Sequence, residues 1–127
     1  MAKLKIIIDD IRFLLKDIKT IIISDVIYNK KDYSTTIDIQ KFYLFIIDNK
    51  KNISYIKTNN GLNYRIKNSK IHCDYSYAMF RDDLKFHLYY LNGILYRKKD
   101  WLKSPEHKSY ILKQKLNNIN NDNRNTV

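Results

Sequence analysis

The sequence has very few of the residues that shape most catalytic and phosphate-binding loops. Its 127 residues include two glycines, one proline, one cysteine and one tryptophan. Gly61 and Gly93 alone cannot form a glycine-rich loop that cradles a phosphate. The lone Cys73 has no partner for an internal disulfide, so we expect a reducing, intracellular compartment.

Long hydrophobic runs are also missing. No apolar stretch approaches the ~20 residues that a membrane-spanning helix needs, so no transmembrane segment is expected. The apolar run of residues 6–8 is followed at once by Asp9 and Asp10, which is unlike a signal peptide. The length of 127 residues predicts a single domain.

The residues that are abundant are Ile, Lys, Asn and Tyr, all encoded by A/T-rich codons. The formal net charge is +11, from 24 basic and 13 acidic residues. A field of this sign attracts nucleic acids and acidic surfaces. The alternative is that codon bias supplies the lysines and that they only keep the surface soluble. The composition leaves both interpretations open.

Residues 3–23 have the apolar spacing of an amphipathic helix. Apolar side chains recur at alternating intervals of three and four residues, at Leu4, Ile7, Ile11, Leu14, Ile18 and Ile21. We expect this helix to pack on the domain's own sheet. Self-association or docking of a partner through helix 3–23 is the sharper alternative.

Residues 35–98 predict an antiparallel meander of about six strands. The expected strands are residues 36–47, 53–57, 62–67, 70–80 and 84–91 and the segment after 93. Asn92-Gly93, between two aromatic-rich runs, suits a two-residue type I′ turn because both central residues need φ > 0. A weaker copy of this hairpin surrounds Asn68-Ser69.

The C-terminal part predicts a short helix and a tail. Ser104 suits an N-cap, Pro105 the first helical position and Glu106 the first turn. The helix is expected over residues 105–116, and the Asn-rich residues 117–127 are expected to be a disordered tail. The predicted fold class is therefore α+β, with a single domain over residues 1–116.

The hairpin of residues 89–97 resembles the repeat unit of MORN-like proteins of large DNA viruses and phages. That unit reads roughly Trp-Tyr-x-Asn-Gly-Lys-x-His-Arg, and here Tyr89, Tyr90, Asn92-Gly93 and Arg97 occupy the corresponding positions. The resemblance covers a quarter to a third of the chain, and the Gly-Pro that follows the unit is missing. It implies a non-enzymatic binding or assembly module built from β-hairpins.

His72, Cys73, Asp74 and His87 form the one cluster of residues in the sequence that could bind a metal or act in catalysis. A zinc site needs three or four converging ligands, and strand alternation would turn Cys73 away from the histidines. We therefore predict no catalytic residue, no metal ligand and no cofactor. Cys73 is expected to be a small core residue instead.

Tyrosines interleaved with basic residues along the meander are the best indication of a binding face, because a sheet of this kind could stack bases and neutralise phosphates or receive an acidic partner. Tyrosine is also an ordinary strand residue. The predicted binding residues are Tyr64, Arg65, Lys67, Tyr89, Tyr96, Arg97, Lys98 and Lys99. Trp101 and Leu102 are expected to cover the last hairpin or, if exposed, to mark a protein interface.

The sequence thus predicts a non-enzymatic binding or assembly protein, encoded by a virus or phage, that uses its hairpin sheet as a protein-interaction surface. Its location would be intracellular, in the host cytoplasm or the virion. The alternative function is a basic nucleic-acid-binding protein, for RNA or single-stranded nucleic acid, in which the Tyr/Lys/Arg face of the sheet is the binding surface. Steep salt dependence of binding would distinguish the alternative.

Overall fold

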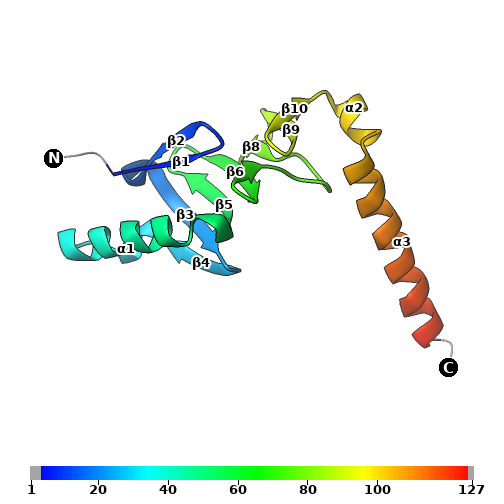
Figure 1. Cartoon of the computed structure of the whole chain (residues 1–127), viewed down its shortest axis with the longest axis horizontal. Coiled ribbons are helices and arrows are strands. Elements are labelled where there is room, and N and C mark those ends of the chain that lie inside the picture. The colour runs from blue at the N-terminus through cyan, green and yellow to red at the C-terminus, as the bar shows by residue number, and fades with distance from the viewer. Residues whose placement is uncertain (1–3, 126–127) are drawn as a thin grey trace.

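The computed structural model describes the backbone of residues 4–125 and the side chains of residues 4–119. It contains both helices and a large antiparallel sheet (Figure 1). The strands are β1 Lys5–Ile8, β2 Ile11–Leu14, β3 Ile18–Ile23, β4 Val26–Asn29, β5 Ile53–Thr58, β6 Leu62–Lys67, β7 Lys70–Ile71, β8 Met79–Arg81, β9 His87–Leu91 and β10 Ile94–Tyr96. The helices are α1 Thr36–Asp48, α2 Lys98–Leu102 and α3 Pro105–Asn125, with 3-10 turns at Leu15–Asp17, Lys30–Asp32 and Lys50–Asn52.

The strands form one two-stranded and one eight-stranded sheet, both antiparallel. β1 pairs with β2, and the larger sheet has the order β10-β9-β8-β6-β5-β3-β4, with β7 attached to β6. The prediction of mixed helix and antiparallel sheet is confirmed at this level. The strands expected at residues 53–57 and 62–67 are present as β5 and β6.

The predicted helix 3–23 is wrong, because this segment forms β1, β2 and β3. Asp9 and Asp10 have φ of 51° and 65°, and so form a two-residue turn that a helix could not contain. A run rich in isoleucine fits both a helical stripe and a pleated strand, and β-branching favours the strand. Self-association through a helix 3–23 is therefore excluded.

The strand predicted over residues 36–47 is also wrong, because these residues form α1. Thr35 is the N-cap, and its side chain accepts a hydrogen bond of 3.0 Å from the backbone N–H of Asp38. Phe42 and Ile46 lie one turn apart and are both buried. Their spacing of four residues places them on one helical face, which packs on the sheet.

The core lies between one face of the large sheet and two covering elements, α1 and the β1–β2 hairpin. The Tyr43 hydroxyl of α1 donates to the Lys5 carbonyl at 2.9 Å, so these two elements are neighbours. The Tyr33 ring stacks on Phe42 at 4.0 Å, and the Phe13 ring of the hairpin meets Tyr64 edge-on at 4.8 Å.

Both predicted turns of the C-terminal half are present. Asn68 and Ser69 have φ of 52° and 62°, and Asn92 and Gly93 have φ of 51° and 81°. The strand expected over residues 70–80 is interrupted, however, since β7 ends at Ile71 and β8 begins at Met79. β9 likewise begins at His87 and not at residue 84.

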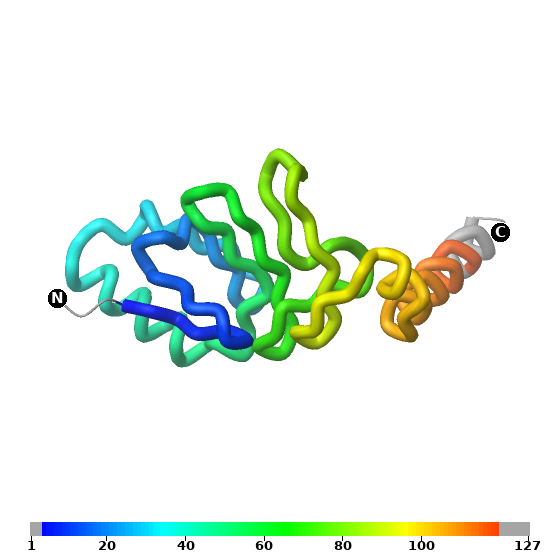
Figure 2. Tube along the Cα trace, turned by 90° about the horizontal axis from the view of Figure 1, so that it is seen from above, coloured from blue at the N-terminus to red at the C-terminus, as the bar shows by residue number. Residues whose placement is uncertain are grey.

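α3 begins as predicted but is longer. The Ser104 hydroxyl oxygen accepts from the His107 backbone N–H at 3.2 Å, which makes Ser104 the N-cap. The helix continues to Asn125, so the tail predicted to be disordered over residues 117–127 is helical up to that residue; residues 126–127 lie outside the described part. No helix of the described chain is both long enough and apolar enough to cross a membrane. Figures 1 and 2 both show α3 running away from the sheet.

Candidate binding surface

The two edges of the large sheet carry exposed apolar side chains. The edge strand β4 exposes Val26 and Ile27, with 62% of Ile27 accessible. The opposite edge strand, β10, exposes Ile94 and Leu95, with 60% of Ile94 accessible. Neither strand contains a charged residue or a proline. Natural sheets commonly use charged residues and proline to block pairing at an edge. Neither β4 nor β10 has such a residue, so nothing of this kind prevents another strand from pairing with them.

The sheet face opposite α1 carries a polar row on β5 and β6. Lys57 forms a salt bridge of 3.1 Å with Asp82, and the Asn63 side-chain amide donates to the same carboxylate at 2.9 Å. Both hydrogen bonds lower the pKa of Asp82, and the bond from Asn63 has the larger effect. The row is thus already paired internally and offers little free charge.

Arg65 of β6 lies among three aromatic rings on the same face. Its guanidinium carbon lies 5.3 Å from the Tyr75 ring centroid, 5.5 Å from that of Tyr77 and 4.8 Å from that of Phe80. One guanidinium nitrogen also donates to the Tyr77 carbonyl at 2.7 Å. These cation–π contacts hold the arginine in place, and Tyr75 stays about half exposed beside it.

Of the predicted binding residues, Arg65 and Tyr89 contribute to one aromatic cluster. The Tyr77 ring links them, since its centroid lies 6.2 Å from that of Tyr89. Tyr64 belongs to the core and is 6% exposed, so it is wrong as a stacking residue. Lys67 is exposed at the end of β6.

The other basic candidates lie beyond β10 and are separated from β6 by β8 and β9 in the sheet. Arg97 pairs with Asp100 at 2.9 Å, and Tyr96 is half-buried. Lys98 and Lys99 are exposed at the start of α2. Two strands of the sheet thus separate Arg65 from the basic residues that follow β10.

Trp101 covers the last hairpin and is not an exposed interface residue. It is 3% exposed, and its indole N–H donates to the Cys73 carbonyl at 3.0 Å. Its ring centroid lies 4.7 Å from that of Tyr89 and 4.1 Å from that of His107. Leu102, in contrast, is exposed. Trp101 therefore lies where the first of the two expectations placed it, as the cover of the last hairpin, and the condition for an interface, exposure, is met by Leu102 alone.

The cluster of His72, Cys73, Asp74 and His87 does not converge. The His72 Nδ1 accepts from the Asn92 backbone N–H at 2.9 Å, and burial lowers the pKa of His72. Cys73 is buried, whereas His87 is exposed. Within the described residues, no group of three or more His, Cys, Asp or Glu side chains is arranged to hold a metal ion.

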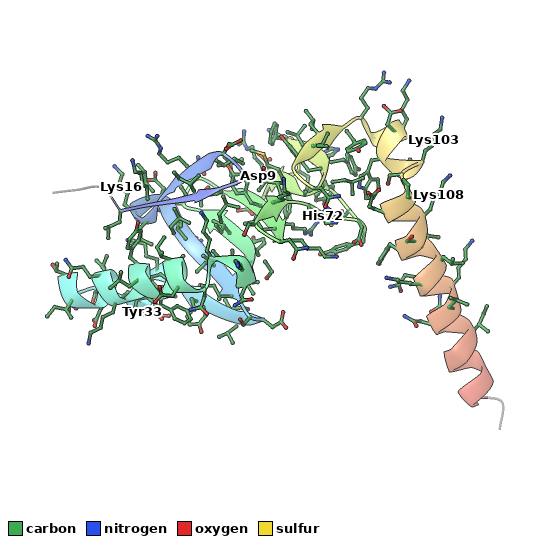
Figure 3. The ribbon with its side chains drawn as sticks, in the orientation of Figure 1. Asp9, Lys16, Tyr33, His72, Lys103 and Lys108 are labelled. Atoms are coloured by element: carbon green, nitrogen blue, oxygen red, sulfur yellow. The ribbon has the colours of Figure 1, made fainter. Side chains whose placement is uncertain are left out.

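The hairpins β1–β2, β6–β7 and β9–β10 meet at Asp9, which lies in the turn of the first of them. The Asp9 carboxylate accepts from the Ile71 backbone N–H at 3.2 Å, and the Gly93 N–H donates to the Ile71 carbonyl at 2.9 Å. Figure 3 shows Asp9 at the tip of its hairpin, on the side that faces β9 and β10. A Cβ at position 93 would lie 2.4 Å from the Asp9 carboxylate. Glycine is therefore required there by close approach as well as by its φ.

Sequence reasoning missed the residues that complete the aromatic cluster, namely Tyr75, Tyr77, Phe80 and His107. Tyr75 and Tyr77 were placed on a regular strand, whereas residues 72–78 are irregular. An irregular segment is free to turn both rings toward Arg65. Comparison of the chain with protein-family models, with curated proteins and with solved structures found no match in any of the three.

Proposed function

We propose that this protein is a non-enzymatic binding or assembly protein that uses its hairpin-built sheet as a protein-interaction surface. The observation that carries the proposal is the pair of bare sheet edges, β4 and β10. Each exposes two large apolar side chains on a strand without charge or proline. Bare edges of this kind pair readily with a strand from another chain.

A second copy of this chain is the first partner to test, because each copy has both edges. Pairing of β4 with β10 of the next copy would continue into a filament, whereas pairing of like edges would close a dimer. The resemblance of residues 89–97 to MORN-like repeats agrees with an assembly role. It would also place the protein in a large DNA virus or phage, in the host cytoplasm or in the virion.

The test is sedimentation velocity from micromolar to submillimolar concentration on the wild type, Ile27→Lys and Ile94→Lys. Each substitution adds a charge at an exposed edge position, so folding should be retained. A filament contact is lost in both variants, whereas a closed dimer is lost in only one. Ile37→Lys is the matched control, since Ile37 is 64% exposed and belongs to α1, not to either edge strand. A wild type that stays monomeric throughout contradicts the proposal.

A second candidate function is the binding of single-stranded nucleic acid, and the Arg65 cluster favours it. A half-exposed Tyr75 ring next to the Arg65 guanidinium suits base stacking, which is worth ~1–3 kcal/mol per base. Titration of a labelled oligothymidine should show affinity that falls steeply with salt. Tyr75→Ala should weaken binding, whereas Tyr43→Phe, on the helix α1 that covers the other face of the sheet, should not. Binding that is unchanged by salt or by Tyr75→Ala would eliminate this candidate.

A further inference from the structure

The first turns of α3 are anchored to the body of the protein through one side of the helix. The His107 Nδ1 lies 2.9 Å from the Asp74 carbonyl, and the His107 ring packs on Trp101. The Tyr110 ring lies 5.7 Å from that of Tyr75. These contacts fix the direction in which α3 leaves the sheet, and they use the side of the helix that carries His107 and Tyr110.

The other side of α3 carries apolar residues without cover from the described chain. Leu112 is 59% exposed, and Leu116 and Ile119 are also exposed. The spacing from 112 to 116 to 119 places these three side chains along one stripe of the helix. Ile111 is exposed too, but it follows His107 by four residues and lies nearer the anchored side. An apolar stripe on a helix normally packs against a partner surface.

A groove lies where this stripe begins, at the junction of α2 and α3. It has a volume of about 460 Å³, which is enough to receive several side chains. Leu102 of α2 and Ile111 and Leu112 of α3 supply its apolar lining. The complete lining consists of Leu102, His107, Lys108, Ile111, Leu112 and Lys115.

Positive charge is concentrated around this groove. Residues 97–119 contain seven basic and two acidic residues, a net charge of +5 out of +11 for the whole chain. Lys108 and Lys115 lie in the lining itself, and Lys103 lies at the end of α2 (Figure 3). None of the three salt bridges among the described residues uses a lysine of this region. These charges are therefore available to a ligand.

We propose that this groove docks an acidic amphipathic helix of a partner protein. The apolar side chains of that helix would pack on Leu102, Ile111 and Leu112, and its carboxylates would face Lys108 and Lys115. Helices with apolar positions three and four residues apart bind grooves of this type, and complementary charge selects the partner and its orientation. This surface and this partner class are separate from the sheet edges.

The shape of the surface favours a peptide over an anionic membrane. A membrane-surface helix places its apolar residues in one plane, whereas Leu102 and Ile111 lie in a concave junction between two helices. A second copy of the same region is disfavoured, because two segments of net charge +5 repel each other.

The experiment uses the full chain and a labelled synthetic helical peptide, with leucines three and four residues apart and glutamates at most other positions. Fluorescence anisotropy measures affinity, and a peptide without tryptophan leaves Trp101 as an independent reporter, since Trp101 contacts His107 of the groove. We expect the acidic peptide to bind at least about tenfold more tightly than its lysine counterpart. Replacing its leucines by serine should remove binding.

Variants of the protein then assign the binding to the groove. Lys108→Glu combined with Lys115→Glu, and separately Leu112→Ser, should each weaken binding by at least about tenfold. Lys113→Glu is the matched control, because Lys113 is exposed on the same helix but does not line the groove. All four positions are exposed or at the rim, so circular dichroism should confirm unchanged folding.

The result that overturns the proposal is absence of peptide binding, or an equal loss in Lys113→Glu, which would mean attraction by net charge alone. Binding to vesicles of phosphatidylcholine and phosphatidylglycerol that depends on Leu112, without peptide binding, would assign the surface to a membrane and would also overturn it. The peptide titration is repeated on the Ile27→Lys, Ile94→Lys double variant. Loss of assembly with retained peptide binding separates this inference from the proposed function.

Discussion

The first and last hairpins, β1–β2 and β9–β10, have turns of the same backbone type but of different composition. Asp9 and Asp10 form the first turn with φ of 51° and 65°, and Asn92 and Gly93 form the last with φ of 51° and 81°. At the first turn, the carboxylate of Asp9 bonds to the Ile71 N–H. At the last turn, no side chain would fit beside that carboxylate. Comparison of the two turns shows that two factors restrict the residue at a position of positive φ. One is the backbone conformation, and the other is the space left by neighbouring side chains.

The largest expected effect is that of Gly93→Ala, which disturbs the close approach of the last turn to Asp9 of the first turn. The new Cβ meets both the positive φ and the bound Asp9 carboxylate, so we expect a loss of about 2–3 kcal/mol in the free energy of unfolding. Urea unfolding measures it.

Gly61→Ala is the control for this prediction. Gly61 has φ of 83°, but a Cβ there would lie 3.2 Å from the Asp82 carboxylate, a tight contact that a small shift of that side chain relieves. We expect a loss of about 1 kcal/mol, mainly from backbone strain. Equal losses in the two variants would show that close approach to Asp9 adds nothing.

A smaller effect is expected from Thr35→Ala, which tests whether the first hairpin depends on α1. Loss of the N-cap bond to Asp38 should cost about 1 kcal/mol. Because Tyr43 of α1 donates to Lys5, amide hydrogen exchange should accelerate more in β1–β2 than in β9–β10. Thr36→Ala is the control, since the side chain of Thr36 lies inside the first turn and is not the cap. Uniform acceleration in both hairpins would contradict the expected dependence.

Asp10→Gly should stabilise the protein slightly and make the first turn more like the last. Asp10 is exposed at φ of 65°, a conformation that glycine adopts without steric cost, so we expect a gain of about 0.5 kcal/mol. Asp25→Gly, at the equivalent position of the β3–β4 turn, should give a similar gain. A rise in the urea midpoint reports the gain, and a fall in both variants would mean that these carboxylates stabilise their turns.

The smallest effect is confined to a pH window and concerns the last hairpin, where His72 accepts from Asn92. Burial lowers the pKa of His72 below its ordinary value, so near and below that value the unfolded chain binds more protons than the folded one. The stabilisation is complete above the ordinary pKa of about 6.5 and is lost as pH falls through the lowered value.

Urea midpoints measured from pH 8 down to pH 5 should therefore fall. His72→Gln should flatten the slope. An unchanged slope in His72→Gln would show that the buried ring does not titrate in this window.

The parts of the fold that could be predicted are those in which one local signal suffices. Asn92-Gly93 needs positive φ at two positions, and Ser104-Pro105 marks a helix start, so each signal is complete within a few residues. The run of residues 5–23 is ambiguous because apolar side chains at most positions, many of them isoleucine, satisfy periods of both two and 3.6. Asp9-Asp10 decided the structure, but Asp-Asp is a weak turn signal by itself.

The candidate surfaces were less predictable because they depend on contacts between distant segments. Arg65 was recognised, whereas its partners Tyr75 and Tyr77 come from an irregular segment that no periodicity describes. The capping signal at Thr35 was present but was outweighed by the β-branched and aromatic content of residues 36–47. Packing of Phe42 and Ile46 on the sheet stabilises the helix despite that content.

The bond between Asp9 and Ile71 also orders events during synthesis. The first hairpin leaves the ribosome with its tip carboxylate unpaired, because the amide that it bonds belongs to a residue translated 62 positions later. Gly93, which closes the same junction, follows later still. Contacts over such separations form slowly, so the nascent N-terminal half should remain open to chaperones until nearly the whole chain has been made.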